Sequence, residues 1–238
     1  MLDKRVRKNA MDENQFDLMR RQMILEVVAE TVFLTQRLGR AALDTRVINV
    51  MAKIPREEFV PVELRPYAYL NRPLPVGCGK TISQPFIIAL MTDLLELQTG
   101  DAVLEVGTGV GYQAAILAEL VQQVYSVEII DELAQHAKRR LMRLGYRNIE
   151  VRTGNGYYGW PEHAPFDKII VTAAPNLIPP PLLAQLKPGG RMVIPAGIPD
   201  EQQLMLVEKA ENGTLATSNI LPVRFSELEG DSDYQGAA

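Results

Sequence analysis

Cysteine and histidine are almost missing from this chain of 238 residues, which contains Cys78, His136 and His163 and no others. A single cysteine cannot form an intramolecular disulfide. One cysteine and two histidines are also too few for a cysteine-rich zinc site or a multi-histidine metal centre. We therefore expect a protein without a metal site.

An excess of positive charge and a long apolar run are missing as well. The chain has 25 lysines and arginines against 29 aspartates and glutamates, with a net charge of -4, whereas nucleic-acid binders usually present a basic surface. No stretch approaches the roughly 20 apolar residues of a membrane span, and the charged start of the chain lacks the apolar core of a secretion signal. These absences favour a cytoplasmic protein whose partners are neither nucleic acid nor a membrane.

Apolar residues are plentiful, at 47% of the chain, which is ample for the core of one substantial domain. In the first part of the chain they recur at helical spacing. We expect one or two amphipathic helices over residues 14–40, another over 44–51 and a buried helix over 87–97. The segment from Glu63 to Pro85 is rich in proline and is expected to be an extended loop.

From residue 102 onward, short apolar runs alternate with helical segments, a pattern typical of a parallel sheet with helices on both faces. The expected fold is α/β, a doubly wound and mostly parallel Rossmann-like sheet that ends in an antiparallel strand pair. We expect a helical extension packed on the core at 1–66, the main domain at 67–230 and a frayed tail at 231–238. The expected strands are 102–107, 124–130, 149–154, 168–174 and 191–197, with helices at 113–121 and 132–144 and the antiparallel pair at 204–209 and 220–225.

The stretch GCGKT, residues 77–81, looks like the end of a nucleotide-binding P-loop. That motif needs a glycine five positions before Gly79, where this chain has Leu74. The loop should also follow an apolar strand and open a helix, yet NRPLP precedes it and Pro85 falls in the first turns of that helix. The sequence therefore argues against a nucleotide phosphate site here.

A glycine turn, EVGTGVG, ends the first strand of the parallel part. A dinucleotide fingerprint would place its third glycine at position 112, where this chain has Tyr112. The form E-x-G-x-G-x-G instead resembles the S-adenosylmethionine turn of class I methyltransferases. This cofactor carries a sulfonium and an ammonium group, which suit carboxylates, and Glu105 and Glu128 stand at the ends of the first two strands. An acid in the second position is placed to bind ribose hydroxyls.

The resemblance extends over the chain from about Arg46 to Phe225. The segments IPREEFVP, GKTISQP, VTAAP, LKPGGRMVIPAG and LPVRF look like protein-L-isoaspartate O-methyltransferase. The resemblance implies methyl transfer from S-adenosylmethionine to the carboxylate of isoaspartyl residues in damaged proteins and peptides, so that the ester collapses to a succinimide. It also implies a Rossmann-like fold of the methyltransferase type.

The same resemblance implies a set of site residues. Ser83, with Thr81, is the expected catalytic residue and positions the acceptor carboxylate, which needs no general base because it is already ionised near neutral pH. Asn155 replaces the aspartate that the family usually has, so we expect weaker cofactor binding. Cys78 and Lys80 also depart from the family pattern. The expected cofactor-binding residues are Glu105, Gly107, Thr108, Gly109, Gly111, Glu128, Asn155 and Gly156.

Three alternatives stay open at this stage. The enzyme could keep its cofactor and act on a different carboxylate acceptor, or the chain could be a non-catalytic relative with weakened cofactor binding. Ser83 could also simply cap the helix that begins near Pro85. The helical stretch before Arg46 is longer than usual in the family and could cover the substrate groove or build a dimer, so the chain is expected to be a monomer or a homodimer.

Overall fold

The computed structural model describes the backbone of residues 13–38 and 42–230, and the side chains of 13–32 and 42–230. The tail expected at 231–238 lies outside these residues, as do the first twelve residues of the expected helical extension. No helix among the described residues is both long and apolar enough to cross a membrane.

A seven-stranded sheet forms the centre of the molecule, in the order β5-β4-β3-β6-β7-β8-β9. The first five strands in this order are parallel, and β8 and β9 continue the sheet antiparallel. This confirms the predicted fold class. The strands are β3 (Ala102–Val106), β4 (Gln123–Glu128), β5 (Ile149–Thr153), β6 (Phe166–Val171), β7 (Leu186–Ala196), β8 (Gln203–Lys209) and β9 (Leu215–Pro222).

Apolar side chains cover both faces of this sheet, because successive residues of a strand point to opposite sides. Val103 and Ile170 belong to one core cluster together with helical residues such as Met51, Leu90 and Ile116, whereas Leu104 and Ile169 belong to a second cluster with Leu182. The helices of the main domain are α3 (Pro85–Leu94), α4 (Tyr112–Ala118), α5 (Asp131–Arg143) and α6 (Pro180–Gln185).

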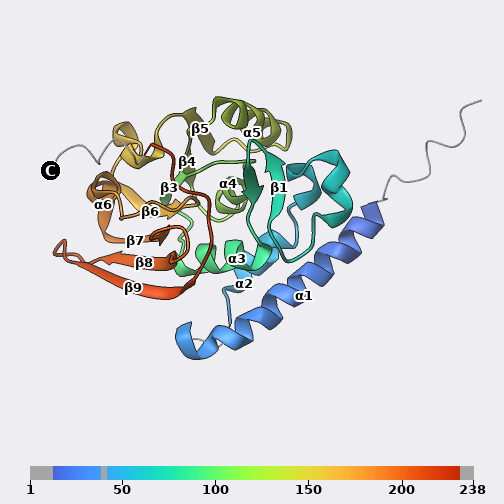
Figure 1. The fold of residues 1–238 in the computed structure, drawn as a ribbon, viewed down its shortest axis with the longest axis horizontal. Helices are drawn as coiled ribbons and strands as arrows, with labels where there is room; N and C mark the ends of the chain where they lie inside the picture. Colours follow the sequence, from blue (N-terminus) through green and yellow to red (C-terminus); the bar gives the residue numbers. More distant parts are fainter. Residues whose placement is uncertain (1–12, 39–41, 231–238) are drawn as a thin grey trace, which may run out of the picture.

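Two further helices precede the sheet. The helix α1 (Glu13–Leu38) runs along the outside of the molecule, and α2 (Thr45–Met51) connects it to the body (Figure 1). Met23 and Val27 of α1 are fully buried and belong to the same core cluster as the residues of α3. The helical segment therefore shares its core with the sheet. The 3-10 turns η1 (Arg56–Phe59) and η2 (Val62–Tyr67) follow it, and η3 (Gly156–Tyr158) and η4 (Pro161–His163) follow β5.

The prediction of an extended loop from Glu63 to Pro85 is wrong in part. After η2, the chain forms a two-stranded antiparallel hairpin of β1 (Leu74–Gly77) and β2 (Lys80–Ile82). Its turn has positive φ at three successive positions, 96°, 52° and 68° at Gly77, Cys78 and Gly79. The two glycines adopt such a conformation without strain, whereas Cys78 is a non-glycine residue in the left-handed region. The GCGK stretch is therefore a hairpin turn.

The last described segment, residues 223–230, is called the C-terminal strap here. It leaves β9 and crosses back over the sheet, where it is drawn in dark red (Figure 1). Backbone hydrogen bonds fix it beside the end of β6: Ala174 donates to the Ser226 carbonyl at 2.8 Å and accepts from the Leu228 N–H at 2.9 Å. The strap therefore lies across the edge at which the parallel strands end.

Candidate active site

The site begins with the glycine loop after β3, at the point where the strand order reverses. Gly107 has a φ of 95°, and a Cβ at this position would overlap the Thr172 hydroxyl. That hydroxyl donates a 2.6 Å hydrogen bond to the Gly107 carbonyl. Gly111, at φ 88°, packs against Leu141 and precedes the first residue of α4. Side chains at either position would displace the loop, so the glycines let it turn tightly beside β6.

Glu128 lies at the end of β4 and is held by the backbone of two loops. One carboxylate oxygen accepts the Gly109 N–H at 2.7 Å, and the other accepts the Ile130 N–H at 3.0 Å. Glu128 is 5% exposed and lines the cavity beside the glycine loop. Each carboxylate oxygen has two acceptor sites, so both keep one for a hydroxyl group of a ligand.

Glu105 is fully buried behind the glycine loop and does not line the cavity. One carboxylate oxygen accepts a short hydrogen bond from the Ser126 hydroxyl, which lies 2.5 Å from the Thr108 hydroxyl. The other has no partner among the described residues. Burial raises the pKa of Glu105 to about 8. Thr108 does line the cavity, so Glu105 reaches it only through Ser126 and Thr108.

Asn155 and Gly156 follow β5. The Asn155 side-chain carbonyl accepts the Tyr157 N–H at 2.9 Å and caps η3, and its amide donates to the Gly230 carbonyl at 3.5 Å. Gly156 lines the cavity, whereas Asn155 does not. A Cβ at Gly156 would overlap Val106, which explains the need for glycine here.

The cavity lies between the glycine loop, the hairpin and the C-terminal strap. Three of the predicted site residues, Glu105, Gly111 and Asn155, lie outside its lining. The predicted residues that line it are Thr81, Ser83, Gly107, Thr108, Gly109, Glu128 and Gly156. Most of the sequence-based set therefore lines one cavity.

A second hollow, a groove of about 470 Å³, opens on the other side of Ser83. It lies between α1, the hairpin, the start of α3 and the strap, and it meets the cavity at four residues that line both hollows. All four carry hydroxyl groups: Thr81, Ser83, Thr172 and Ser226. Sequence reasoning named the first two and missed Thr172 and Ser226, although Thr172 belongs to the VTAAP motif and Ser226 directly follows LPVRF.

Ser83 does not cap the helix α3. The N-cap position belongs to Gln84, and no side chain makes a capping hydrogen bond there. The Ser83 carbonyl accepts a 2.7 Å hydrogen bond from the guanidinium of Arg56. The hydroxyl of Ser83 makes no hydrogen bond with any described residue. The structure therefore fixes the backbone at Ser83 and leaves its side chain available at the junction of the two hollows.

Arg56 is a fully buried arginine of the IPREEFVP segment. Besides Ser83 it donates to the Ala68 carbonyl at 2.8 Å, and it lies 4.8 Å from the ring centre of Tyr112. Burial lowers its pKa. No carboxylate among the described residues forms an ion pair with it, so its charge is stabilised by carbonyl groups and by the face of an aromatic ring.

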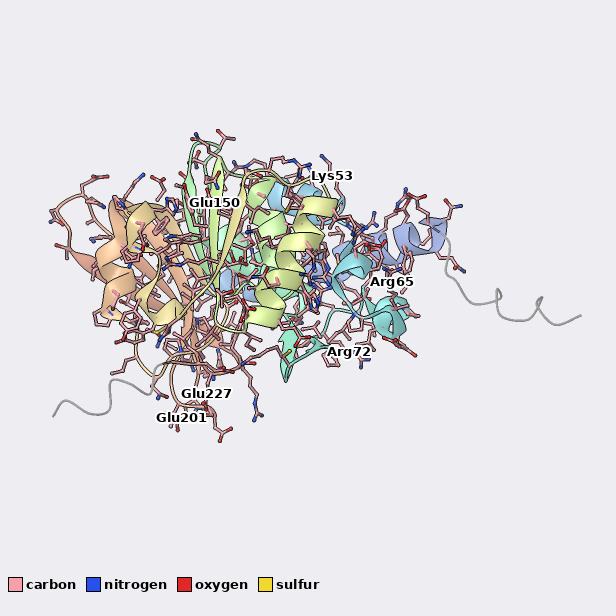
Figure 2. All side chains as sticks on the ribbon, turned by 90° about the horizontal axis from the view of Figure 1, so that it is seen from above. Lys53, Arg65, Arg72, Glu150, Glu201 and Glu227 are labelled. Carbon is pink, nitrogen blue, oxygen red and sulfur yellow. The ribbon has the colours of Figure 1, made fainter. Side chains whose placement is uncertain are left out.

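The mouth of the cavity is bridged by an ion pair between Lys80 and Glu229, whose charged atoms lie 2.5 Å apart. Lys80 belongs to β2 of the hairpin and Glu229 to the strap. Figure 2 shows Glu227, also of the strap, low in the view, with Glu150, near the start of β5, well above it. The strap therefore covers the carboxyl ends of the strands, where open parallel sheets bind ligands.

A parallel sheet with a glycine turn at its switch point and an acid at the end of the next strand is an arrangement that class I methyltransferases share, and the solved structures that resemble this chain include such an enzyme. The chain belongs to the protein-L-isoaspartate(D-aspartate) O-methyltransferase family, whose model matches residues 29–233. The family resemblance predicted from the sequence is therefore confirmed.

Individual relatives agree with this assignment. "Protein-L-isoaspartate O-methyltransferase 1" of Polaromonas sp. is 64% identical over 219 residues, which are 92% of this chain and 93% of that one. A solved protein-L-isoaspartate O-methyltransferase has a TM-score of 0.75 at 30% identity and covers 89% of this chain and 66% of its own. A Plasmodium falciparum protein solved in complex with S-adenosyl-L-homocysteine shares the fold, with a TM-score of 0.71 at 22% identity over 93% of this chain and 99% of its own.

Proposed function

We propose that this protein transfers the methyl group of S-adenosylmethionine to the free carboxylate of L-isoaspartyl residues in damaged proteins and peptides. The resulting ester closes to a succinimide, from which normal aspartate can be recovered. The observation that carries the proposal is the junction of two hollows at hydroxyl side chains, Ser83 among them. One hollow contains the glycine loop and Glu128, and the other is a groove open to a peptide. Family membership supports the same reaction.

The residues of the cavity fit this cofactor. Gly107 and Gly109 allow a ligand to approach the backbone, and Glu128 retains acceptor sites for the two ribose hydroxyls. Lys80 is the only cation among the described lining residues, and it is already paired with Glu229. Such a cavity suits a ligand with hydroxyl groups and positive charge better than one with a pyrophosphate. When bound, S-adenosylmethionine supplies an electrophilic methyl group on a sulfonium.

The acceptor needs positioning and no deprotonation. A carboxylate with an ordinary pKa near 4 is ionised at neutral pH, so the site requires no general base. We assign Ser83 the role of donating a hydrogen bond to the acceptor carboxylate, with Thr81 beside it. Arg56 holds the backbone of Ser83 and thereby fixes the position from which its side chain extends. Holding oxygen and methyl carbon in line accounts for a large part of the catalysis in such a displacement, several kcal/mol in well-oriented systems.

The remaining predicted residues do not line the cavity, and in this proposal they act through neighbouring residues. Glu105 holds Thr108 through Ser126, Gly111 allows the turn into α4, and Asn155 shapes the loop that presents Gly156. The Asn155 carbonyl keeps one acceptor site beside its bond to Tyr157, which is available to an adenine amino group only if the loop moves towards the cavity. We propose a cytoplasmic location on the sequence composition alone.

A paired-peptide assay tests the proposal. The protein is incubated with labelled S-adenosylmethionine and two peptides that differ only in aspartate versus isoaspartate. We expect base-labile label on the isoaspartyl peptide and none on its aspartyl twin. Label on neither peptide, together with methylation of another carboxylate, would support the first alternative. Calorimetry with S-adenosylhomocysteine addresses the non-catalytic alternative, which requires that binding be absent or that bound cofactor give no transfer.

A further inference from the structure

The groove beside Ser83 carries an acidic side chain from the N-terminal helix. Glu30 of α1 is the only acidic residue among the described residues that line the groove, and Arg224 of the strap is the only basic one. Met23 and Val27 bury the same side of α1 in the core, which fixes the helix and places Glu30 at the groove wall. The N-terminal helix therefore contributes directly to the surface that faces an acceptor.

Neutral amides hold the Glu30 carboxylate in place. Asn71 donates a 2.6 Å hydrogen bond to one of its oxygens, and the Gln84 amide lies 3.3 and 3.4 Å from the two oxygens. Asn71 in turn accepts the Phe86 N–H at 3.0 Å, at the start of α3. Gln84 directly follows Ser83 in the chain, so Glu30 is anchored to the loop formed by these two residues, which is called the serine loop here.

No described cation balances the charge of Glu30. Arg224 lines the same groove, but its side chain is 84% exposed and lies 3.8 Å from Asp200. Arg72 follows Asn71 and is exposed at the edge of the molecule that also carries Glu227 (Figure 2). Neither arginine lies within ion-pair distance of Glu30. Amide donors orient a carboxylate without neutralising it, so a partly buried negative charge faces the groove.

We propose that Glu30 is a specificity-determining residue that makes the enzyme prefer isoaspartyl peptides with a lysine or arginine beside the damaged residue. This inference rests on the proposed function. Glu30 repels an isoaspartyl carboxylate that enters the groove. A cation beside that carboxylate on the peptide is attracted to Glu30, and this attraction offsets the repulsion. Two unit charges about 4 Å apart interact by about 1 kcal/mol in water, which corresponds to roughly a fivefold difference in an equilibrium constant.

A peptide series with matched variants tests the inference. Three isoaspartyl peptides differ at one neighbour of the damaged residue, which is lysine, norleucine or glutamate, and the series is made once for each side. For the unaltered protein we expect kcat/KM to favour the lysine over the glutamate peptide by about five- to tenfold on one side. In Glu30→Gln this ratio should fall below about twofold, mainly through KM, because the amide keeps a hydrogen-bond acceptor and loses the charge.

The control variant is Glu26→Gln, which removes the same charge one helical turn earlier on α1. Glu26 is exposed, accepts a bond from Gln22 and does not line the groove, so its lysine-to-glutamate ratio should equal that of the unaltered protein. High salt should reduce the lysine-to-glutamate ratio in the unaltered protein and in Glu26→Gln, because it screens the charge of Glu30.

Two results would overturn the inference. An unchanged lysine-to-glutamate ratio of kcat/KM in Glu30→Gln would exclude a role for the charge of Glu30. Equal loss of activity on all three peptides would mean that Glu30 only supports the structure of the serine loop. The norleucine peptide separates this failure from that of the proposed function. If that peptide is methylated without any preference for lysine, only the inference about Glu30 is wrong, whereas methylation of no isoaspartyl peptide removes the proposed function itself.

Discussion

Replacing Glu105 by glutamine should change how the stability of the protein depends on pH. Glu105 is fully buried and its pKa is raised, chiefly by burial, from an ordinary value of 4.5 to about 8. Between these values the carboxyl group is protonated in the folded protein and ionised in the unfolded chain. The unfolded state therefore binds fewer protons, and the free energy of unfolding falls as pH rises through this window.

The size of the effect follows from the shift. One pKa unit corresponds to about 1.4 kcal/mol, so Glu105 lowers the free energy of unfolding by about 3 kcal/mol between about pH 5.5 and about pH 7.5. Its stabilising contribution is complete below the unfolded pKa and is lost as pH approaches 8. Glutamine cannot ionise, but its side-chain oxygen can still accept the Ser126 hydroxyl. The variant should lack this part of the pH dependence. Its unpaired amide lowers the free energy of unfolding by the same amount at every pH, so it does not change the slope of that free energy against pH.

Urea denaturation at several pH values in this window gives the slope for each protein. The free energy of unfolding of Glu105→Gln should fall less steeply with pH than that of the unaltered protein, by about 1.4 kcal/mol per pH unit. All other titrating groups are common to both proteins and cancel in the comparison. Glu63→Gln, at an exposed position of η2, is the control and should keep the original slope. Equal slopes for Glu105→Gln and the unaltered protein would refute the reasoning.

Three further predictions concern the serine loop and the cavity mouth. Ser83→Ala should lower kcat by about tenfold or more while calorimetry finds cofactor affinity nearly unchanged; an equal loss of both would mean that the serine is structural. Arg56→Lys cannot span the carbonyls of Ser83 and Ala68 together, so kcat should fall by about tenfold at saturating cofactor; a lower melting temperature with unchanged kcat would contradict a positioning role. Lys80→Gln removes the pair with Glu229, a contribution of up to about 1 kcal/mol, so stopped-flow release of S-adenosylhomocysteine should quicken by up to about fivefold at low salt; an unchanged rate would show that the pair does not restrain the strap.

The main sheet could be predicted because its strands are buried on both faces and therefore consist largely of apolar residues. Parallel strands covered on both faces read as continuous apolar runs, and each of the five predicted runs is a strand of the sheet. The hairpin at residues 74–82 was not predicted, because its strands are short and its prolines indicated a loop. The helix α6, Pro180–Gln185, lies in a run of prolines and leucines too short to show helical periodicity. Local pattern fails where tertiary contacts decide the structure.

The site was predictable to the extent that it lies on a single motif. The glycine loop and Glu128 follow from the strand ends, since parallel strands present their carboxyl ends at one edge. The position of Glu105 behind Thr108 could not be predicted, because the sequence does not show how deeply each side chain is buried. Glu30 and Ser226 line the same groove as Ser83 only through the packing of α1 and the path of the strap. No spacing in the sequence connects residues this far apart.

The N-terminal segment and the serine loop are coupled by two contacts of different character. Arg56 reaches the backbone of Ser83, and Glu30 reaches the side chain of Gln84, the next residue. Among the described residues, the buried Arg56 has no carboxylate partner and Glu30 has no cation within ion-pair distance, and burying an unpaired charge is costly. The chain uses each charge on the loop that begins at Ser83. Because the proposed reaction needs no base and depends on alignment, rigid support from outside the sheet is the kind of contribution that this site requires.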